Sequence, residues 1–421
     1  MRFFLRTLIA STVAISGISA SAQTLEETVR RAIAHHPSLE QARLDIDLAQ
    51  EDVLSARAGR SVRVSASLSS AIQSVGTDRA FAIDSGETFI NQGQIEAVLP
   101  LYTSGALSAS IEQARLLVDA SEYAFEASKD QIELGAISAH LNAIDAREAV
   151  SIRERNTERL AKQYTAAQDR FEIGVLTRTD VALSDARHQA ALAGLAAAMA
   201  DLDAARAQYV ELTGTAPDML AEPSGKIVLP VSLDDAFAQA RENNPRLVQL
   251  RILERVAELG VLGARSQRGI TLEAFGTAGV QEGNWQNDFT DTSATVGLRA
   301  AKPLYSGGAL LSEERQALVR REQARVQTRL AENQLVRDLS SAWAREQASQ
   351  TALEAARREV EAARIALEGA EVEVGVGLRT TLDLLDQEQD LLEAQLRLIG
   401  ARKNVYISQY QIRAFMGSLT L

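Results

Sequence analysis

Cysteine is absent from this chain of 421 residues, which excludes a disulfide framework, thiolate metal sites and an acyl anchor on an N-terminal cysteine. Basic residues are in deficit, since 44 Lys and Arg face 56 Asp and Glu. The formal net charge of −12 argues against a broad basic face that would bind nucleic acid. Beyond the N-terminus no segment offers about 18 consecutive apolar residues, so helical membrane spans are excluded. If the mature protein enters a membrane, it must do so as strands.

The N-terminus carries an export signal. Arg2 and Arg6 precede an apolar run in MRFFLRTLIASTVAISGISASAQ, and a small-x-small triplet at 20–22 stands before Gln23. This order is typical of a secretory signal peptide, and the apolar run is too short for a spanning helix. We therefore expect residues 1–22 to be removed, which leaves 42 basic and 56 acidic residues and a net charge of −14.

The chain repeats itself at long range. LPLYTSGAL at 99–107 returns as KPLYSGGAL at 302–310, and TLEETVRRAIAHHPSLEQARL at 24–44 matches SLDDAFAQARENNPRLVQLRI at 232–252. Four further landmark pairs share one offset of 203 residues: Pro100 and Pro303, Gly174 and Gly377, Asp180 and Asp383, and Gly214 and Gly417. Pro37 and Pro245 are offset by 208 residues, so five residues differ between the two proline landmarks of each copy. We expect a surface loop of variable length in that interval.

A connector separates the two copies. TGTAPDMLAEPSGKIVLP at 213–230 holds three of the seven prolines of the chain, a composition typical of a linker. The sequence thus predicts a signal peptide at 1–22, a first repeat at 23–213, a linker at 214–231 and a second repeat at 232–421. Each repeat is predicted to contain a helix, two strands and a long helical hairpin.

Long helices are predicted where proline is missing. Residues 104–216 and 304–421 contain no proline and are rich in the strong helix formers Ala, Leu, Glu, Gln and Arg. Apolar residues there follow the 3-4 spacing of coiled-coil seams, one formed by Leu353, Ala356, Val360, Ala363, Leu367, Ala370 and Val374, the other by Leu382, Leu385, Gln389, Leu392, Leu396 and Ile399. Each repeat therefore has a long helix, a break near Gly174 or Gly377, and a returning helix. The first helix, about 104–173, would be on the order of 100 Å long and needs many neighbours, which symmetric copies supply most simply.

Strand patterns precede each PLY phrase. Apolar and polar residues alternate in SVRVSASLSS at 61–70 and QIEAVLPLY at 94–102, and more weakly at 269–279 and 292–301. Segments of about ten alternating residues have the length of a tilted membrane strand. Polar loops are expected around GTDRAFAIDSGE and EGNWQND, with Trp285 as an interfacial or surface aromatic. The alternative is a pair of soluble hairpins.

Four strands cannot close a barrel, because barrels start at about eight strands and an open edge cannot face lipid. If the strands lie in a membrane, several chains must contribute them. The sequence itself does not set the number of chains.

The ordered set of motifs resembles the TolC family, the outer-membrane exit ducts of Gram-negative efflux pumps and type I secretion systems. The resemblance covers nearly all of the mature chain. It rests on the NNP-type helix start at 243–245, both PLY(S/T)xG phrases, RFEIGVLTRTDVALSDA at 170–186 and VGVGLRTTLDLLDQEQ at 374–389. It implies a mainly α protein with a membrane β-barrel part: a homotrimer with a twelve-stranded barrel in outer-membrane lipid and a long periplasmic α-barrel. It further implies docking on a periplasmic adaptor (membrane fusion protein) and an inner-membrane transporter.

The resemblance also assigns functional residues to the turn between the last two helices. It places a gating arginine at Arg379 and two pore carboxylates at Asp383 and Asp386, which would form stacked rings that favour cations in a three-fold assembly. It implies that Arg379 contacts Thr179 and Asp180 of the first-half turn and so holds the closed state. The family's type member has a tyrosine where this chain has Val374, so one contact of the closed state differs here.

Each of these residues also has a simpler interpretation. Two carboxylates on an acidic helix usually belong to a solvated face, and Asp180 fits a helix start favoured by the dipole. No pocket signal or aromatic platform supports a glycosidase-like pair of Asp383 and Asp386. His35 and His36 precede a proline at a helix junction, and His140 and His188 are too distant in sequence to complete a metal site with them.

The sequence therefore supports three functional hypotheses. The first is a passive outer-membrane channel that extends into the periplasm, uses no cofactor and performs no bond chemistry. The second is a soluble periplasmic coiled-coil adaptor or scaffold, which would leave the alternating segments unexplained. An enzyme is the third, but no motif for a nucleophile, a metal or a phosphate is present. The cargo, a protein or a small molecule, stays open, although 170–187 is closest to members that serve type I protein secretion.

The repeated PLY phrase is predicted to mark the junction between strand and long helix. Pro100 and Pro303 have no backbone N–H to donate, at the point where strand pairing is expected to end. Gly105 and Gly307, with the serines beside them, supply turn and N-cap chemistry for the helix start.

Overall fold

The structure, a computed structural model, describes residues 23–79, 82–223, 225, 227–283 and 289–419. The predicted signal peptide at 1–22 and Trp285 lie outside these residues. The first half contains α1 (Leu25–His35), α2 (Pro37–Ala58), β1 (Arg63–Arg79), β2 (Ala82–Tyr102), α3 (Ala106–Glu172) and α4 (Arg178–Thr213). The second half repeats this order with α5 (Leu233–Asn243), α6 (Pro245–Ser266), β3 (Thr271–Gly283), β4 (Phe289–Ala301), α7 (Ala309–Gly375) and α8 (Thr381–Phe415).

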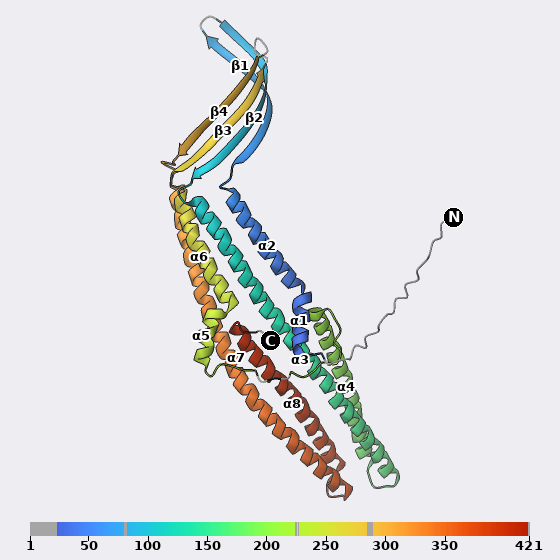
Figure 1. Ribbon diagram of the computed structural model, residues 1–421. Coiled ribbons are helices and arrows are strands. Elements are labelled where there is room, and N and C mark those ends of the chain that lie inside the picture. The colour runs from blue at the N-terminus through green and yellow to red at the C-terminus, as the bar shows by residue number, and fades with distance from the viewer. Residues whose placement is uncertain (1–22, 80–81, 224, 226, 284–288, 420–421) are drawn as a thin grey trace, which may run out of the picture.

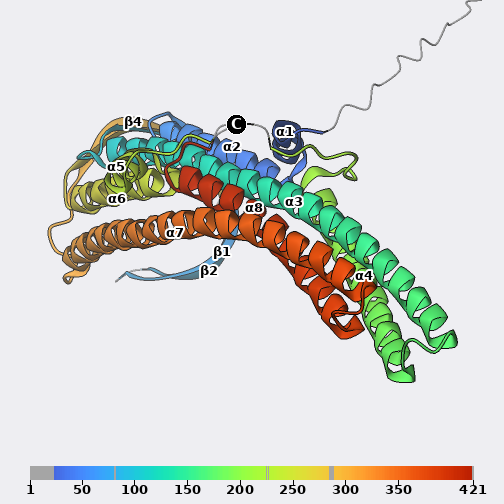
Figure 2. The ribbon, with the colours of Figure 1, turned by 90° about the horizontal axis from the view of Figure 1, so that it is seen from below.

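The molecule is elongated, with a sheet at one end and two helical hairpins at the other (Figure 1). All four strands form one antiparallel sheet in the order β1-β2-β3-β4. Below the sheet the helices keep the same lateral order, because α2 packs on α3, α3 on α6 and α6 on α7. Nearer the turns, α3 packs on α4 and α8, and α8 packs on α7. The fold is therefore a single layer that curves along its length (Figure 2).

The predicted long helices are confirmed. Both α3 and α7 have 67 residues, which corresponds to about 100 Å at 1.5 Å per residue. The short helices begin as the NNP-type motif predicts: Pro37 and Pro245 occupy the first turn of α2 and α6, where a missing N–H is tolerated. None of the helices in the described part of the chain combines the length and the apolar character needed to cross a membrane.

The coiled-coil seam predicted for α7 is also present. Ala356, Leu367 and Ala370 are buried, and Leu367 and Ala370 pack with Leu384 and Leu391 of α8. The seam predicted for α8 is broader than expected. Its predicted members Leu385 and Leu392 are buried, but so are Leu384 and Leu391, whereas Leu382 is exposed. A helix that packs against two neighbours buries more than one stripe, so the simple 3-4 pattern described only part of this face.

The strands lie where alternation predicted them, but the first hairpin is longer than expected. The ladder of β1 and β2 runs from Arg63 opposite Val98 to Arg79 opposite Ala82. Residues 76–79 and 82–87 of the segment predicted as a loop are therefore paired strand, and residues 80–81 lie outside the described residues. The five extra residues of the first repeat lie in this hairpin, because α2 and α6 have 22 residues each. Backbone hydrogen bonds between strands do not require apolar side chains, so the polar composition of this segment did not indicate a loop as we had expected.

The sheet exposes an apolar face of period two. Val64, Leu68 and Ile72 on β1 and Val296 and Leu298 on β4 are all exposed. Soluble sheets bury such a face against a second layer, and the described chain supplies no second layer.

The junctions between strand and long helix differ in detail from the prediction. Pro100 is still paired, opposite Glu273, and the register shifts directly after it, whereas β4 ends two residues before Pro303. The N-cap residues of α3 and α7 are Gly105 and Gly308, both with positive φ, and neither helix has a side-chain cap bond at that residue. Gly307 precedes the cap, in the position that Ser104 (φ 51°) occupies in the first half. The N-cap residue is thus glycine in both helices, while the hydroxyl oxygens of Thr103 and Ser306 accept from the amides of Leu107 and Leu310 at 3.3 and 3.5 Å. Ser104 Oγ donates to the carbonyl of Ile270 at 2.8 Å and ties the two halves together.

Candidate functional site

The two hairpin turns lie at the same end of the molecule, far from the sheet (Figure 1). Each turn contains a glycine with positive φ, Gly174 at 79° and Gly377 at 75°. The amide of the next residue donates to a carbonyl five residues earlier, Val175 to Arg170 and Leu378 to Glu373, each at 2.8 Å. These bonds satisfy the carbonyls at the helix end, and they give the two turns the same geometry.

The returning helices both begin with a capping box. Asp383 accepts hydrogen bonds from the amide of Thr380 at 3.0 Å and from its hydroxyl at 2.7 Å, while the Asp383 amide donates to the hydroxyl oxygen at 3.2 Å. Thr177 and Asp180 form the same arrangement. The Thr380 side chain, then its backbone N–H, and then the charge of Arg379 keep the pKa of Asp383 below its usual value. Asp383 therefore carries a negative charge, but its immediate partners are neutral groups.

Asp386, the second predicted pore carboxylate, has a charged partner. Its Oδ1 lies 2.9 Å from Nη2 of Arg187, which comes from α4 in the other hairpin. Both side chains are partly exposed, at 50% and 38%. The structure thus places Asp383 and Asp386 three residues apart on the first turns of α8 but gives them different electrostatic surroundings.

Arg379 does not contact the first-half turn within the described chain. It forms an ion pair with Glu373, which precedes it in the same turn region. Thr179 is exposed on the first turn of α4, and Asp180 is engaged by Thr177. A contact of Arg379 with Thr179 or Asp180 stays a prediction.

Sequence reasoning missed the apolar residues that the turns expose. Ile173 and Val175 are exposed in the first turn, and Val376 and Leu378 in the second. The signal was visible in the segments IGVL and VGVGL, since turns are usually polar. Four apolar side chains in solvent at one end of a molecule indicate a surface that other protein covers.

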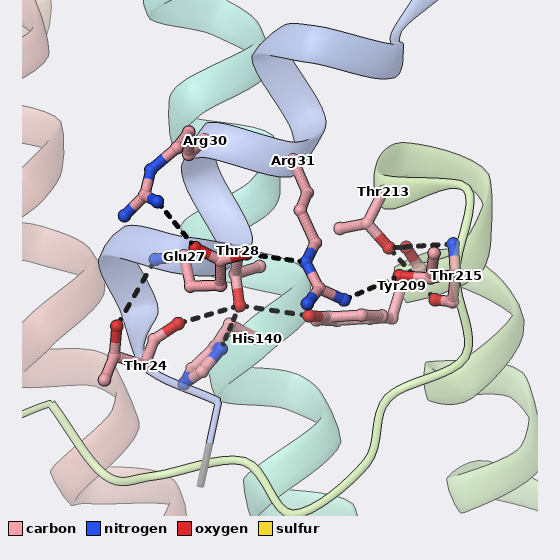
Figure 3. Close-up of polar contacts among 9 residues, drawn as sticks. All are labelled: Thr24, Glu27, Thr28, Arg30, Arg31, His140, Tyr209, Thr213 and Thr215. Carbon is pink, nitrogen blue, oxygen red and sulfur yellow. Dashed lines mark hydrogen bonds and ion pairs between the residues drawn. The ribbon is translucent and has the colours of Figure 1, made fainter. Parts of the chain in front are cut away.

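A buried polar cluster lies near the middle of the molecule, where α1, α3, α4 and the linker meet (Figure 3). Thr28, His140 and Tyr209 are each fully buried. The Thr28 hydroxyl lies 2.8 Å from His140 Nδ1 and 3.0 Å from the Tyr209 hydroxyl. His140 Nε2 faces the carbonyl of Ala221 at 2.9 Å and must carry a hydrogen, because a carbonyl only accepts. Burial lowers the pKa of His140, so the ring is neutral and joins three helices to the linker.

A buried carboxyl lies in α8, two residues after Asp386. Glu388 is 1% exposed, and neither of its oxygens has a hydrogen-bond partner within the described residues. Burial raises its pKa to about 7, opposed by Arg159 of α3 and reinforced by Glu371 of α7. The protonated form is therefore the one that suits this packing.

Ion pairs join the two halves above this level. Lys403 of α8 lies 2.9 Å from Asp145 of α3. Arg402 lies 2.9 Å from Glu222 of the linker and 3.5 Å from Glu148 of α3. These contacts hold the second hairpin against the first near the linker.

A family model described as "Outer membrane efflux protein" matches residues 28–215 and 236–418, once in each half. The chain belongs to the outer membrane efflux protein family.

Similar members of this family come from several Gram-negative bacteria. Outer membrane efflux protein BepC of Brucella suis is 31% identical over 289 residues, 68% of this chain and 63% of BepC. Outer membrane protein TolC of Escherichia coli K12 is 24% identical over 97% of this chain and 85% of TolC. Alkaline protease secretion protein AprF of Pseudomonas aeruginosa is 25% identical over 71% of this chain and 64% of AprF. The chain thus spans just under two thirds of BepC and AprF but most of TolC.

Solved outer-membrane channels share the fold of this efflux protein. The CmeC channel of Campylobacter jejuni superposes with a TM-score of 0.84 at 13% identity, over 100% of this chain and 94% of that one. VceC of Vibrio cholerae gives a TM-score of 0.79 at 19% identity, over 93% and 96%. The predicted TolC-like fold is therefore confirmed, and a soluble adaptor is not supported. The protein is an outer-membrane protein that extends into the periplasm, in a family of channel proteins that in general perform no bond chemistry.

Proposed function

We propose that this efflux protein assembles into a homotrimeric exit duct, through which an efflux pump or a type I secretion system passes its cargo across the outer membrane. The observation that carries the proposal is the open layer: within the described residues, one sheet and one row of helices each have two free edges. The duct is passive, and energy comes from the inner-membrane partner. Channels of this family work in general as trimers with adaptor and pump proteins.

Ring closure would satisfy both free edges of the layer. Within the described residues β1 and β4 each have one paired neighbour, and they run in opposite directions because every pairing in the sheet is antiparallel. The β4 edge of one chain can therefore continue the antiparallel order onto β1 of the next. Three chains give twelve strands, enough to close a barrel, and the exposed apolar residues of β1 and β4 would then face outer-membrane lipid.

The hairpin turns would form the periplasmic constriction of this duct. Asp383 and Asp386 would line it as rings of three carboxylates, which favour cations. Arg379 would hold the closed state through Thr179 and Asp180 of a neighbouring chain. Since Val374 replaces the family's tyrosine, this arginine contact would carry a larger share of the closure.

The exposed turn residues and the relatives of this protein indicate which partners the duct would have. The exposed apolar turn residues would meet the periplasmic adaptor (membrane fusion protein) beneath the duct, which receives cargo from the inner-membrane transporter. The likeness to AprF, named for alkaline protease secretion, favours protein cargo and type I secretion.

Fractionation and cross-linking test this assembly. The chain has no cysteine, so pairs introduced along the edges, such as Ser65→Cys or Ser67→Cys on β1 with Thr295→Cys or Ser293→Cys on β4, report only on contacts between these edges. We expect outer-membrane recovery and oxidation of at least one pair to a covalent trimer. Recovery of the intact chain as a soluble periplasmic monomer would exclude the duct and favour the adaptor.

Planar-bilayer recordings test the pore lining. We expect a cation-selective wild-type channel, with a smaller cation preference in the double variant Asp383→Asn and Asp386→Asn. Unchanged selectivity would remove these two residues from the pore.

A further inference from the structure

The two carboxylates assigned to the constriction are not electrostatically equivalent in this chain. Asp383 is held by the hydroxyl and the amide of Thr380, which are neutral, while the nearby Arg379 forms its ion pair with Glu373. Asp386 is held by the guanidinium of Arg187 at 2.9 Å, so its charge is matched by an equal positive charge.

Arg187 reaches Asp386 from the other hairpin. Both α4 and α8 begin at the turns, and the two residues lie on the order of 14 Å and 8 Å from the starts of their helices at 1.5 Å per residue. Among the ion pairs of the described residues, this is the one that connects α4 with α8. The other pairs between the hairpins, from Arg402 and Lys403, lie much nearer the linker.

The electrostatic effect of this pair outweighs its effect on stability. Both side chains are partly exposed, and exposed ion pairs contribute little to folding. A permeating ion, however, is attracted by the sum of the nearby charges, and a cation 2.9 Å from a carboxylate cancels most of that carboxylate's field at larger distance.

We propose that Arg187 is a residue that determines the ion selectivity of the channel: its pair with Asp386 neutralises the inner carboxylate ring and leaves Asp383 as the ring that attracts cations. The proposal rests on the duct described above, because it needs Asp383 and Asp386 near the pore. Of the two carboxylates that each chain contributes to the constriction, it leaves only that of Asp383 without a compensating ion pair. The pair also connects the two hairpins of one chain near their turns.

Reversal potentials across a low-salt KCl gradient test the proposal on the full-length trimer in planar bilayers. Arg187→Gln should raise the ratio of cation to anion permeability, because it frees three carboxylates. A unit charge about 10 Å from an ion in water changes the local ion concentration about twofold, so three charges predict an increase of several-fold. Arg187→Lys keeps the positive charge and should therefore retain the wild-type permeability ratio. If Arg187 acted only through side-chain packing, Arg187→Lys would change the ratio as well. The increase should shrink in molar salt, where the Debye length is about 3 Å.

Matched variants separate the outcomes. Arg206→Gln removes an arginine of the same helix that pairs locally with Asp203, and it should leave the ratio unchanged. If Arg187→Gln leaves the ratio unchanged or lowers it while Asp383→Asn lowers it, the duct stands and the role of Arg187 is wrong. If Asp383→Asn, Asp386→Asn and Arg187→Gln all match the wild type, the pore lining itself is wrong, and the proposal falls with it.

The exchange variant Arg187→Asp with Asp386→Arg tests the connection between hairpins. Arg187→Gln should raise the conductance of the closed channel, and the exchange variant should lower it again, since it restores an ion pair in reverse order. A leak that stays raised in the exchange variant would contradict the connecting role.

Discussion

His140 is a buried side chain whose protonation state matters for how the chain is held together. Its ring contacts Thr28 of α1 and the carbonyl of Ala221 in the linker, and Thr28 in turn contacts Tyr209 of α4. The cluster is fully hydrogen-bonded and buried, so removing one member leaves others without partners. The cluster thus connects the short helix α1, the linker and the hairpin of α3 and α4 at one point.

Acidification should lower the local stability of the region around His140. Burial lowers the pKa of His140 below 6.5, so the folded state binds fewer protons than the unfolded state between the two pKa values. The stability that the neutral ring provides is therefore present above about pH 6.5 and is lost as the pH falls through the folded pKa. Hydrogen exchange, corrected for its intrinsic rate, should show weaker protection of α1 and residues 213–223 at pH 5.5 than at pH 7.5.

Two variants control this measurement. His140→Asn should remove the pH dependence of protection in this region. Thr28→Val, which replaces the hydroxyl with a methyl group of similar size, should destabilise the region by about 1–3 kcal/mol at either pH. Equal protection of the wild type at both pH values would contradict a neutral His140.

Gly417 and Gly377 allow a matched comparison of two glycines with positive φ. A Cβ at Gly417 would lie 2.8 Å from the backbone carbonyl carbon of Asn243, whereas nothing lies within 4 Å of a Cβ at Gly377. Gly377→Ala should therefore lose only about 1–2 kcal/mol, from the left-handed backbone. Gly417→Ala should lose clearly more, because the α5–α6 junction must move. Urea unfolding of the detergent-solubilised protein measures both, and equal losses would show that the contact with Asn243 is not restrictive.

At the scale of elements, some features of the helical hairpins can be predicted from the sequence and others cannot. The capping box at Thr380 and Asp383 follows from the spacing of residue types in TTLD, and the turn glycines follow from the break in helical composition. The pairing of Arg187 with Asp386 does not follow, because the two residues are 199 positions apart and meet only when the hairpins pack. The predicted α8 seam included Gln389, whereas Glu388 is the buried residue, since α8 packs against both α7 and α3.

Glu388 should make the seam between the hairpins weaker at alkaline pH. Burial raises the folded pKa of Glu388 to about 7, above its ordinary value of 4.5, so the seam is most stable below pH 4.5 and loses stability as the pH rises through 7. The shift corresponds to a loss on the order of 3 kcal/mol per chain. Arg159 of α3 and Glu371 of α7 act on it with opposite signs. Exchange protection of α8 should fall between pH 5 and pH 8.

Neutral variants test the origin of this effect. Glu388→Gln should keep high protection of α8 at both pH values. Glu371→Gln removes only the repulsive neighbour, so it should lower the pKa of Glu388 and reduce the loss without abolishing it. A pH-dependent loss that persists in Glu388→Gln would assign the effect to another group.

At the scale of the whole molecule, the repeat determines the architecture. The landmarks shared by the two halves predicted one helix, two strands and a long helical hairpin in each half, whereas the structure has two short helices before the strands, divided at Pro37 and Pro245. Sequence could not predict the lateral order, in which α3 lies between α2 and α6 above and between α4 and α8 below. That order depends on side-chain packing between the halves, such as Ser104 against the start of β3, and not on the periodicity of either half.

The closed state of the assembled duct yields the last prediction. If Arg379 holds neighbouring chains together through Thr179 and Asp180, Arg379→Gln should raise the leak conductance of the trimer in planar bilayers. Within its own chain Arg379 pairs with Glu373, so a purely local role would make Glu373→Gln equally leaky. A closing role across chains predicts the opposite for Glu373→Gln, since it frees Arg379 for its neighbour and should leave the leak unchanged or lower. Equal leak in both variants would therefore assign the closed state to the local pair of Arg379 and Glu373. A wild-type leak in Arg379→Gln would assign it to contacts other than Arg379, with Arg187 and Asp386 as the next pair to test.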